Sequence, residues 1–200
     1  RYGFDAEASD LADNSYRLFL GEWARRNCPE NYNAVTGEAL DQPDTDSFYG
    51  WGALMPTMAV GEVTDVNPWN GWEITHGLGD SSVGPILTPI GAAWVQSASA
   101  WMQVIVDGDR VLQATVPGRY RHIELGERAC RLVLPPVPAD DHQKRWLAFP
   151  KVARARVVSA RLGDQPLVPE LTQDEDGVGV GSFLRLPPTT DPQPFEMLLS

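Results

Sequence analysis

The placement of proline is the sequence feature that most constrains how this chain folds. Of the 17 prolines in the 200-residue chain, 13 lie from Pro85 onward. Proline lacks a backbone donor and collides with the preceding turn of a helix, so this region cannot hold long helices. Short apolar runs stand between the prolines instead, at 100–106, 110–116, 130–134, 154–162, 183–186 and 195–199. Such runs, separated by Gly and Pro, predict an antiparallel β-sandwich-like domain over residues 100–200.

Two dipeptides in this region predict tight turns. Asp107-Gly108 lies between two of the apolar runs and is a β-hairpin signal. Gly163-Asp164 predicts a second turn of this kind. Residues 66–99 are also rich in Gly and Pro, and we interpret them as a region that connects two domains.

The N-terminal part has a different pattern, with helical spacing over residues 6–27 and again over 46–63. In the first segment one face holds Ala12, Tyr16, Phe19, Leu20 and Trp23. Asp46 or Ser47 can cap the second segment, and Pro56 is expected to bend it. Two helices cannot bury their apolar faces by themselves. They must therefore pack on the sandwich or on protein outside this chain.

Composition and charge exclude several functions. The net charge of -11 argues against a nucleic-acid partner, because phosphate binding needs a basic surface. The sequence has no apolar run near the roughly 20 residues that span a bilayer, so we expect a soluble protein without a membrane partner. The two cysteines, Cys28 and Cys130, do not form a metal-binding motif, and no cofactor is expected. The sequence leaves open whether the compartment is cytoplasmic or periplasmic.

The connection between the predicted helices, residues 28–45, is long and polar and begins CPENYNAVTG. Connections of this length without secondary structure are usually functional or disordered. This one and the start of the next helix supply a carboxylate, amides and aromatic rings: Glu30, Asn31, Tyr32, Asn33, Tyr49 and Trp51. Aromatic rings stack on sugar rings, amides and acids bind sugar hydroxyls, and a carboxylate can activate water for hydrolysis. The segment is therefore a candidate sugar site.

Plainer interpretations of the same residues stay open. Glu30 can be a solvated acid of a loop, and Trp51 can belong to a core. Asp41, Asp44 and Asp46 suggest calcium, but they lack the EF-hand spacing and its closing glutamate.

A family resemblance rests on PENYN, followed after an acidic spacer by FYGWGAL. This pattern resembles the end of the (α/α)6 barrel in inverting glycoside hydrolases. The most similar group is family sixty-three, with processing α-glucosidases and mannosylglycerate hydrolase-like enzymes; trehalases of family thirty-seven have a similar arrangement. The matching residues are Glu30-Asn31-Tyr32, Gly37 and Gly50-Trp51. The resemblance covers residues 1–65, roughly a third of the chain.

The resemblance implies an α+β fragment, in which residues 1–65 form the last helical hairpin of the barrel before the β-sandwich-like domain. It implies that Glu30 is the general base of an inverting hydrolase. The residues implied to bind the sugar are Asn31, Tyr32, Tyr49 and Trp51, with Trp51 stacking on the ring. The implied substrate is an oligosaccharide or small glycoside with an α-linked glucoside- or mannoside-type sugar.

An inverting hydrolase also needs a general acid, with about 6.5–9.5 Å between the two carboxyl groups. No residue of this sequence matches the acid of the family. We therefore expect the N-terminal remainder of the enzyme, possibly as a separate chain, to be a partner that supplies it.

Two other functions fit the sequence: a non-catalytic carbohydrate-binding module, and an accessory or structural subunit whose helices dock on a partner. The tryptophans outside the helical part bear on this choice: Trp69, Trp72, Trp94, Trp101 and Trp146. They can form a sugar-binding face, but we predict that most of them belong to the core or pack against the helical part.

Overall fold

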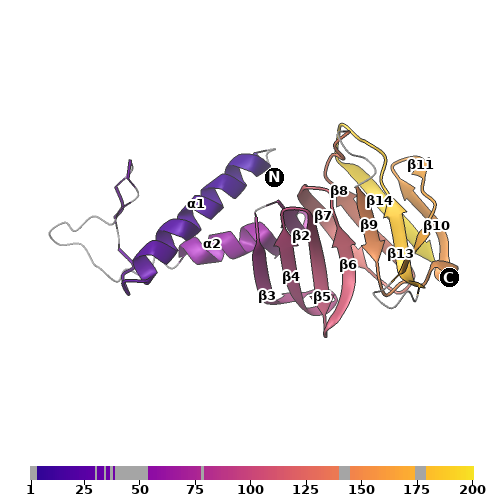
Figure 1. Ribbon diagram of the computed structural model, residues 1–200, viewed down its shortest axis with the longest axis horizontal. Helices are drawn as coiled ribbons and strands as arrows, with labels where there is room; N and C mark the ends of the chain where they lie inside the picture. Colours follow the sequence, from indigo (N-terminus) through magenta and orange to yellow (C-terminus); the bar gives the residue numbers. More distant parts are fainter. Residues whose placement is uncertain are drawn as a thin grey trace. The chain divides into compact units, whose positions relative to one another are not determined.

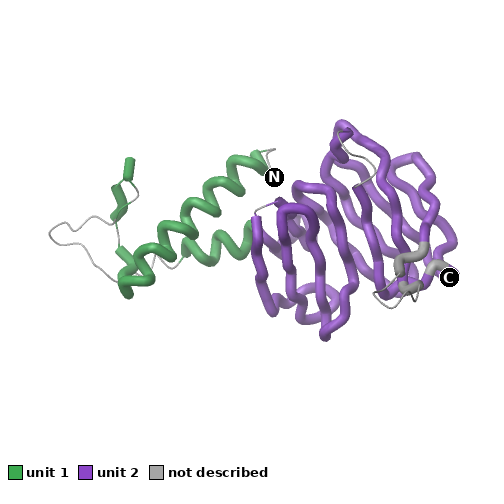
Figure 2. The backbone as a smooth tube through the Cα atoms, viewed as in Figure 1, with its two compact units in different colours: residues 1–62 green, residues 63–200 purple. Residues whose placement is uncertain are grey.

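The computed structural model describes residues 4–29, 31–33, 35–36, 38, 54–77, 79–139, 145–173 and 179–200. The chain forms two compact units, residues 1–62 and residues 63–200 (Figure 2). The first unit contains the helices, and the second contains the strands (Figure 1).

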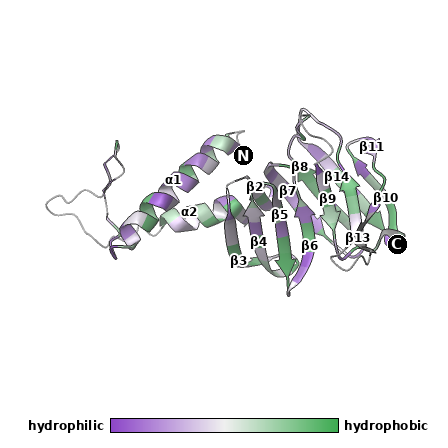
Figure 3. Cartoon of the chain, viewed as in Figure 1, coloured by the Kyte–Doolittle hydropathy of each residue, from purple (hydrophilic) through white to green (hydrophobic). Residues whose placement is uncertain are grey.

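The helical unit contains α1 (Asp5–Trp23) and all of α2 (Leu54–Val63) except its last residue. The Ser9 hydroxyl donates to Glu62 Oε1 at 2.8 Å and so joins the two helices. The predicted apolar face of α1 is only partly buried, with Ala12 buried but Leu20 and Trp23 exposed. In Figure 3, hydrophilic and hydrophobic residues both occur along this helix. Helices in proteins are stabilised mainly by tertiary packing. The exposed residues of α1 leave a surface on which other protein can pack.

The second unit has two antiparallel sheets of seven strands each over the described residues. The first sheet, in spatial order, consists of β1 (Thr64–Asn67), β2 (Gly71–His76), β7 (Gly118–Leu125), β8 (Ala129–Leu134), β14 (Gln193–Leu199), β10 (Val157–Leu162) and β11 (Gln165–Pro166). The second consists of β12 (Glu170–Gln173), β13 (Gly179–Arg185), β9 (Trp146–Phe149), β6 (Asp109–Ala114), β5 (Trp101–Val106), β4 (Gly91–Ala98) and β3 (Ser81–Thr88). A 3-10 turn, Arg154–Arg156, precedes β10.

One hydrophobic core draws side chains from both sheets. The first sheet contributes Ile74, Tyr120, Leu132, Phe195 and Met197, and the second contributes Val95, Val104, Leu112, Leu147, Phe149 and Leu184. Phe149 and Phe195 stack across the two sheets, with ring centroids 5.6 Å apart and planes 14° apart. Full burial of one such side chain contributes roughly 1.5–3 kcal/mol, so this core supplies the main stabilisation of the unit.

The expected fold class is wrong. The described residues are mostly antiparallel β-sheet with two helices, α1 and α2, and this architecture does not fit the last helical hairpin of an (α/α)6 barrel. The helical spacing does produce α1, with 19 residues, but α2 has only 10 described residues. Periodicity reports which residues share a face of a helix, and it does not report what the helix packs against.

The predicted strands are present as β5, β6, β8, β10, β13 and β14. The Asp107-Gly108 turn joins β5 and β6, because Val106 pairs with Asp109. The Gly163-Asp164 turn likewise joins β10 and β11, because Leu162 pairs with Gln165. Residues 66–99 contribute β2, β3 and β4, so this Gly- and Pro-rich segment is part of the sheets.

Gly181 in β13 is a position where the fold requires glycine. Its φ of +85° is in the left-handed region, and an added Cβ would lie 2.5 Å from the Pro150 Cα. We expect Gly181→Ala to lower the free energy of unfolding by roughly 2–4 kcal/mol, through strain and overpacking together. Gly108→Ala is a matched control, because Gly108 has the same φ and no atom lies within 4 Å of its added Cβ.

Urea unfolding of both variants tests this prediction. The control should lose only about 1 kcal/mol, the usual cost of a left-handed non-glycine residue. Equal losses in the two variants would show that backbone strain alone accounts for the effect at Gly181.

Candidate functional site

The candidate site begins where α1 ends. The backbone N–H of Asn27 donates to the Glu22 carbonyl at 3.0 Å, and that of Arg26 donates to the Trp23 carbonyl at 2.8 Å. Arg26 has a φ of 55°, so these two bonds form a Schellman motif with arginine at its left-handed position. The motif stops the helix and directs the chain into Cys28 and Pro29, both of which are buried.

The side chain of Glu22 also stabilises this end of the helix. Its carboxylate is buried and accepts a bond from Asn27 Nδ2 at 3.0 Å. Arg25 Nη1 lies 3.5 Å from the other carboxylate oxygen. A buried carboxylate is stable only when it is paired and hydrogen-bonded, so Glu22 anchors the first residues of the connection. Sequence reasoning missed Glu22, although an acid at the edge of an apolar helix face is a signal for such an anchor.

The other side of the loop is closed by a turn around Asn33. Its Oδ1 accepts from the backbone N–H groups of Val35 and Thr36, at 2.8 and 3.1 Å. Its own N–H donates to the Glu38 carbonyl at 2.8 Å. Asparagine commonly closes turns in this way. Position 30 therefore lies between two short segments that are both fixed by hydrogen bonds.

Tyr32 is the half-buried aromatic residue of this loop. Burial raises the pKa of its hydroxyl, and the neighbouring Cys28 and Glu22 raise it further. Within the described part of the chain, this hydroxyl is buried without a hydrogen-bond partner. It is therefore a protonated donor at neutral pH that the described residues leave unused. The neighbouring Asn31 is exposed.

Of the predicted site residues, Asn31 and Tyr32 are described, and they lie in this loop. Glu30, Tyr49 and Trp51 lie outside the described residues, as do Gly37, Gly50 and the aspartates considered for calcium. The structure thus shows the two flanks of Glu30 and how they are held.

A depression of about 590 Å³ lies on the outer face of the first sheet of the sandwich. Arg131 and Glu196 form its centre, with Arg131 Nε 2.8 Å from Glu196 Oε1. Arg161 lies 2.9 Å from the second oxygen of Glu196, and Glu124 lies 3.4 Å from Arg131. Hydrogen bonding to Arg131 lowers the pKa of Glu196, and Arg161 lowers it further. These charges satisfy one another across strands, so the cluster is primarily structural.

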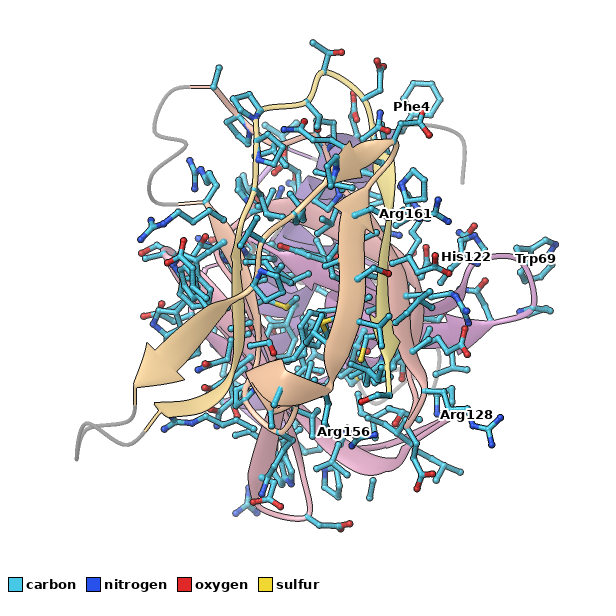
Figure 4. All side chains as sticks on the ribbon, turned by 90° about the vertical axis from the view of Figure 1, so that its right-hand side faces the viewer. Phe4, Trp69, His122, Arg128, Arg156 and Arg161 are labelled. Carbon is cyan, nitrogen blue, oxygen red and sulfur yellow. The ribbon has the colours of Figure 1, made fainter. Side chains whose placement is uncertain are left out.

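A second polar cluster is centred on the buried carboxylate of Glu73 in β2. Asn67 Nδ2 and Asn70 Nδ2 each donate to it at 2.8 Å, and Arg121 Nε lies 3.4 Å away. These bonds hold the turn between β1 and β2, which carries the exposed Trp69. The backbone N–H of His122 donates to the Asn70 carbonyl at 2.7 Å. Trp69 and His122 accordingly lie at the same edge of the sandwich in Figure 4.

The remaining buried reactive groups have structural roles. The two ring nitrogens of His76 lie 3.0 Å from the Val116 carbonyl and 3.1 Å from the Ala98 carbonyl. Burial raises the pKa of Cys130 to about 11, so its thiol is protonated at neutral pH. The described residues contain no cluster of His, Cys, Asp or Glu that would hold a metal ion. Among the described helices, none is long and apolar enough to cross a membrane.

Comparison with models of protein families, with characterised proteins and with solved structures found no match. The likeness to glycoside hydrolases therefore rests on the motif between residues 28 and 54. The structure adds to that motif the two hydrogen-bonded flanks of Glu30 and the unused hydroxyl of Tyr32.

The state of the Tyr32 hydroxyl generates a stability prediction. An unpartnered buried hydroxyl costs free energy, so Tyr32→Phe should leave the free energy of unfolding unchanged or raise it by up to about 1 kcal/mol. Tyr120→Phe is the matched control, because the Tyr120 hydroxyl is buried and donates to the Val116 carbonyl at 2.6 Å. The control should lose about 1 kcal/mol.

Urea unfolding followed by circular dichroism compares the two variants. A loss at Tyr32 as large as that at Tyr120 would show that the Tyr32 hydroxyl has a partner in solution.

Proposed function

We propose that this chain is the part of a glycoside hydrolase that carries the general base, Glu30. The enzyme cleaves an α-linked glucoside- or mannoside-type sugar with inversion. The observation that carries the proposal is the pair of hydrogen-bonded segments on either side of position 30: Glu22 anchors the segment before it, and the turn around Asn33 holds the segment after it. Catalytic groups need such preorganised support, because small displacements greatly reduce rates.

The chemistry of the neighbouring residues is consistent with sugar hydrolysis. A general base must accept a proton from water, which a carboxylate does at neutral pH. Tyr32 offers a half-buried aromatic ring, and Asn31 offers an exposed amide. Aromatic rings stack on sugar rings, and amides bind sugar hydroxyls. In this proposal both residues position substrate, and Tyr49 and Trp51 add aromatic surface.

The general acid must be a second carboxyl group about 6.5–9.5 Å from the base. Glu22 is a carboxylate in this neighbourhood, but Asn27 and Arg25 already engage it and it holds the loop. A residue that holds the loop through these contacts is a positioning residue. We therefore assign the general acid to the N-terminal remainder of the enzyme, whether in the same polypeptide or a separate chain.

The helices also favour a partner of this kind. Exposed apolar side chains occur on α1 and α2: Leu11, Tyr16, Leu20, Trp23, Leu54, Met58 and Val60. Phe19 and Trp23 stack with ring centroids 5.7 Å apart, which adds an aromatic pair to this surface. Exposed apolar side chains that gather into a contiguous patch mark interaction sites, and these helices offer the side chains for one. The same observation supports the second candidate function, a structural subunit that docks through its helices.

Glu30→Gln in the complete enzyme tests the catalytic assignment. The amide cannot accept a proton from water, so kcat should fall by a factor of roughly 10² to 10⁴, while KM changes little. Glu38→Gln is the matched control, because Glu38 lies in the same loop and its side chain contacts only Thr36 among the described residues. This control should retain near-normal turnover.

Azide adds a second readout. If Glu30 activates water, azide can act as a substitute nucleophile and restore part of the lost turnover in Glu30→Gln. Near-normal hydrolysis by Glu30→Gln would overturn the assignment. Native mass spectrometry then separates the two candidate functions, since a partner without glycosidase activity in the complex would favour the structural subunit.

A further inference from the structure

The five tryptophans of residues 63–200 lie in three different environments of the sandwich. Trp72 is 1% exposed and belongs to the core, where its indole N–H donates to Thr64 Oγ1 at 3.1 Å. Trp69 projects from the β1–β2 turn. The other three, Trp94, Trp101 and Trp146, lie on β4, β5 and β9 of the second sheet. Their neighbours Val95, Met102 and Leu147 are core residues, so these three tryptophans point to the outer face.

A row of glutamines crosses the same outer face. Gln96 pairs in register with Gln103, and Gln103 with Gln113, so the three side chains lie side by side on β4, β5 and β6. Gln113 Nε2 donates to Gln103 Oε1 at 3.2 Å, and Gln103 Nε2 donates to Gln96 Oε1 at 2.7 Å. These bonds use one donor and the acceptor of Gln103 and orient all three amides. They leave the amide nitrogen of Gln96 and the amide oxygen of Gln113 at the ends of the row.

The tryptophans flank this row on both sides. Trp94 lies two residues before Gln96, and Trp101 lies two residues before Gln103 on the antiparallel neighbour. Trp94 and Trp101 are 41% and 38% exposed. Because Trp101 pairs with Ala98, the two indoles are separated by four residues along the strands, about 13 Å. That distance is longer than one sugar ring.

Trp146 closes the face on the β9 side. It lies two residues before Ala148, which pairs with Gln113. Its ring packs on Phe183 of β13 with centroids 5.3 Å apart, and Arg185 lies over the Phe183 ring at 5.4 Å. The indole is therefore held in place before any ligand arrives.

We propose that this surface, the glutamine face, binds a neutral oligosaccharide chain. It is defined by Trp94, Gln96, Trp101, Gln103, Gln113 and Trp146. The chemistry of the ligand follows from its residues. Exposed indole rings stack on the apolar faces of sugar rings, and oriented amides exchange hydrogen bonds with hydroxyl groups in both directions. None of the six residues that define the face is ionisable, and the neighbouring Arg185 is paired with Glu170, with its Nε 3.2 Å from Glu170 Oε1. The face therefore selects its ligand through aromatic rings and amides and not through a net charge.

The polar row distinguishes this face from an ordinary protein interface. Gln103 is only 8% exposed, and burying an amide costs free energy unless its bonds are made. The neighbouring glutamines make those bonds, which gives a rigid polar strip between aromatic rings. Protein interfaces also use aromatic anchors. Binding of a protein to this face without any binding of sugar would therefore contradict the proposal. The proposal is independent of Glu30, because the face lies wholly within residues 63–200.

The test uses the full 200-residue chain with two neutral probes, maltohexaose and α-1,6-mannohexaose. Isothermal titration calorimetry measures affinity, and tryptophan fluorescence reports stacking. Trp94→Ala and Trp101→Ala should each weaken binding of the preferred probe by roughly tenfold or more, as expected for aromatic anchors. Trp69→Ala is the matched control, because Trp69 is exposed outside the face, and it should leave the affinity unchanged.

Further variants separate binding from folding. Trp94→Phe keeps an aromatic ring and should retain most of the affinity, whereas Gln103→Met keeps the side-chain volume but breaks the amide row and should weaken binding. Absence of binding by the folded unsubstituted chain to both probes would overturn the proposal, as would equal losses in Trp69→Ala and Trp94→Ala. The hydrolase assignment is tested by the turnover of Glu30→Gln, and the glutamine face by the affinity of Trp94→Ala and Trp101→Ala, so failure of one proposal and failure of the other give different results.

Discussion

The stacking of the two sheets through their inner faces is the constraint on which the rest of the sandwich depends. The Phe149–Phe195 contact joins β9 of one sheet to β14 of the other, with centroids 5.6 Å apart. Around it the core contains almost entirely aliphatic and aromatic side chains from both sheets. Because side chains alternate across a strand, each residue that enters this core sends its neighbours to the outer face. The residues that pack in the core therefore determine which residues lie on the outer faces.

The glutamine face illustrates this dependence. Ala93, Val95, Met102 and Val104 fill the core, and the residues between and beside them, Trp94, Gln96, Trp101 and Gln103, share the opposite side. The register of β4, β5 and β6 then aligns the three amides into one row. The shift in register between Val104 and Ile105 lies beyond this row, so the row itself is uninterrupted. A one-residue slip would move every one of these side chains into the core.

The helical unit is stabilised in a different way. Besides the Ser9–Glu62 bond between the helices, its interactions around the end of α1 are local: the Schellman motif at Arg26, the Glu22–Asn27 bond and the turn around Asn33. These interactions hold the described segments on either side of residue 30, and many apolar side chains of α1 and α2 stay exposed. Hydrogen-bonded segments beside helices with exposed apolar side chains are compatible with the proposed catalytic segment, which other protein would complete. In the proposed hydrolase, Glu30 would also need a second carboxyl group from other protein, because inversion uses two carboxyl groups.

Much of the β-structure was predictable because it depends on neighbouring residues. Apolar runs between prolines correctly predicted β5, β6, β8, β10, β13 and β14, and the Asp-Gly and Gly-Asp turns followed from backbone preferences. The strands β2, β3, β4 and β7 escaped prediction because glycines, a proline and polar residues interrupt their apolar pattern. The barrel hairpin was predicted wrongly, because a short motif and helical spacing do not specify long-range packing.

The sequence by itself determined the strand-forming C-terminal region, the tight turns, the helix of residues 5–23 and the set of polar and aromatic residues around Glu30. Only the tertiary structure decided that Trp72 is core while Trp94 and Trp101 are exposed, that three glutamines form one hydrogen-bonded row, and that Glu22 and Glu73 are buried anchors. The physical reason is that burial and hydrogen-bond partners depend on which distant strands become neighbours. Local sequence sets the conformation of a segment, but the register between segments sets what each side chain meets.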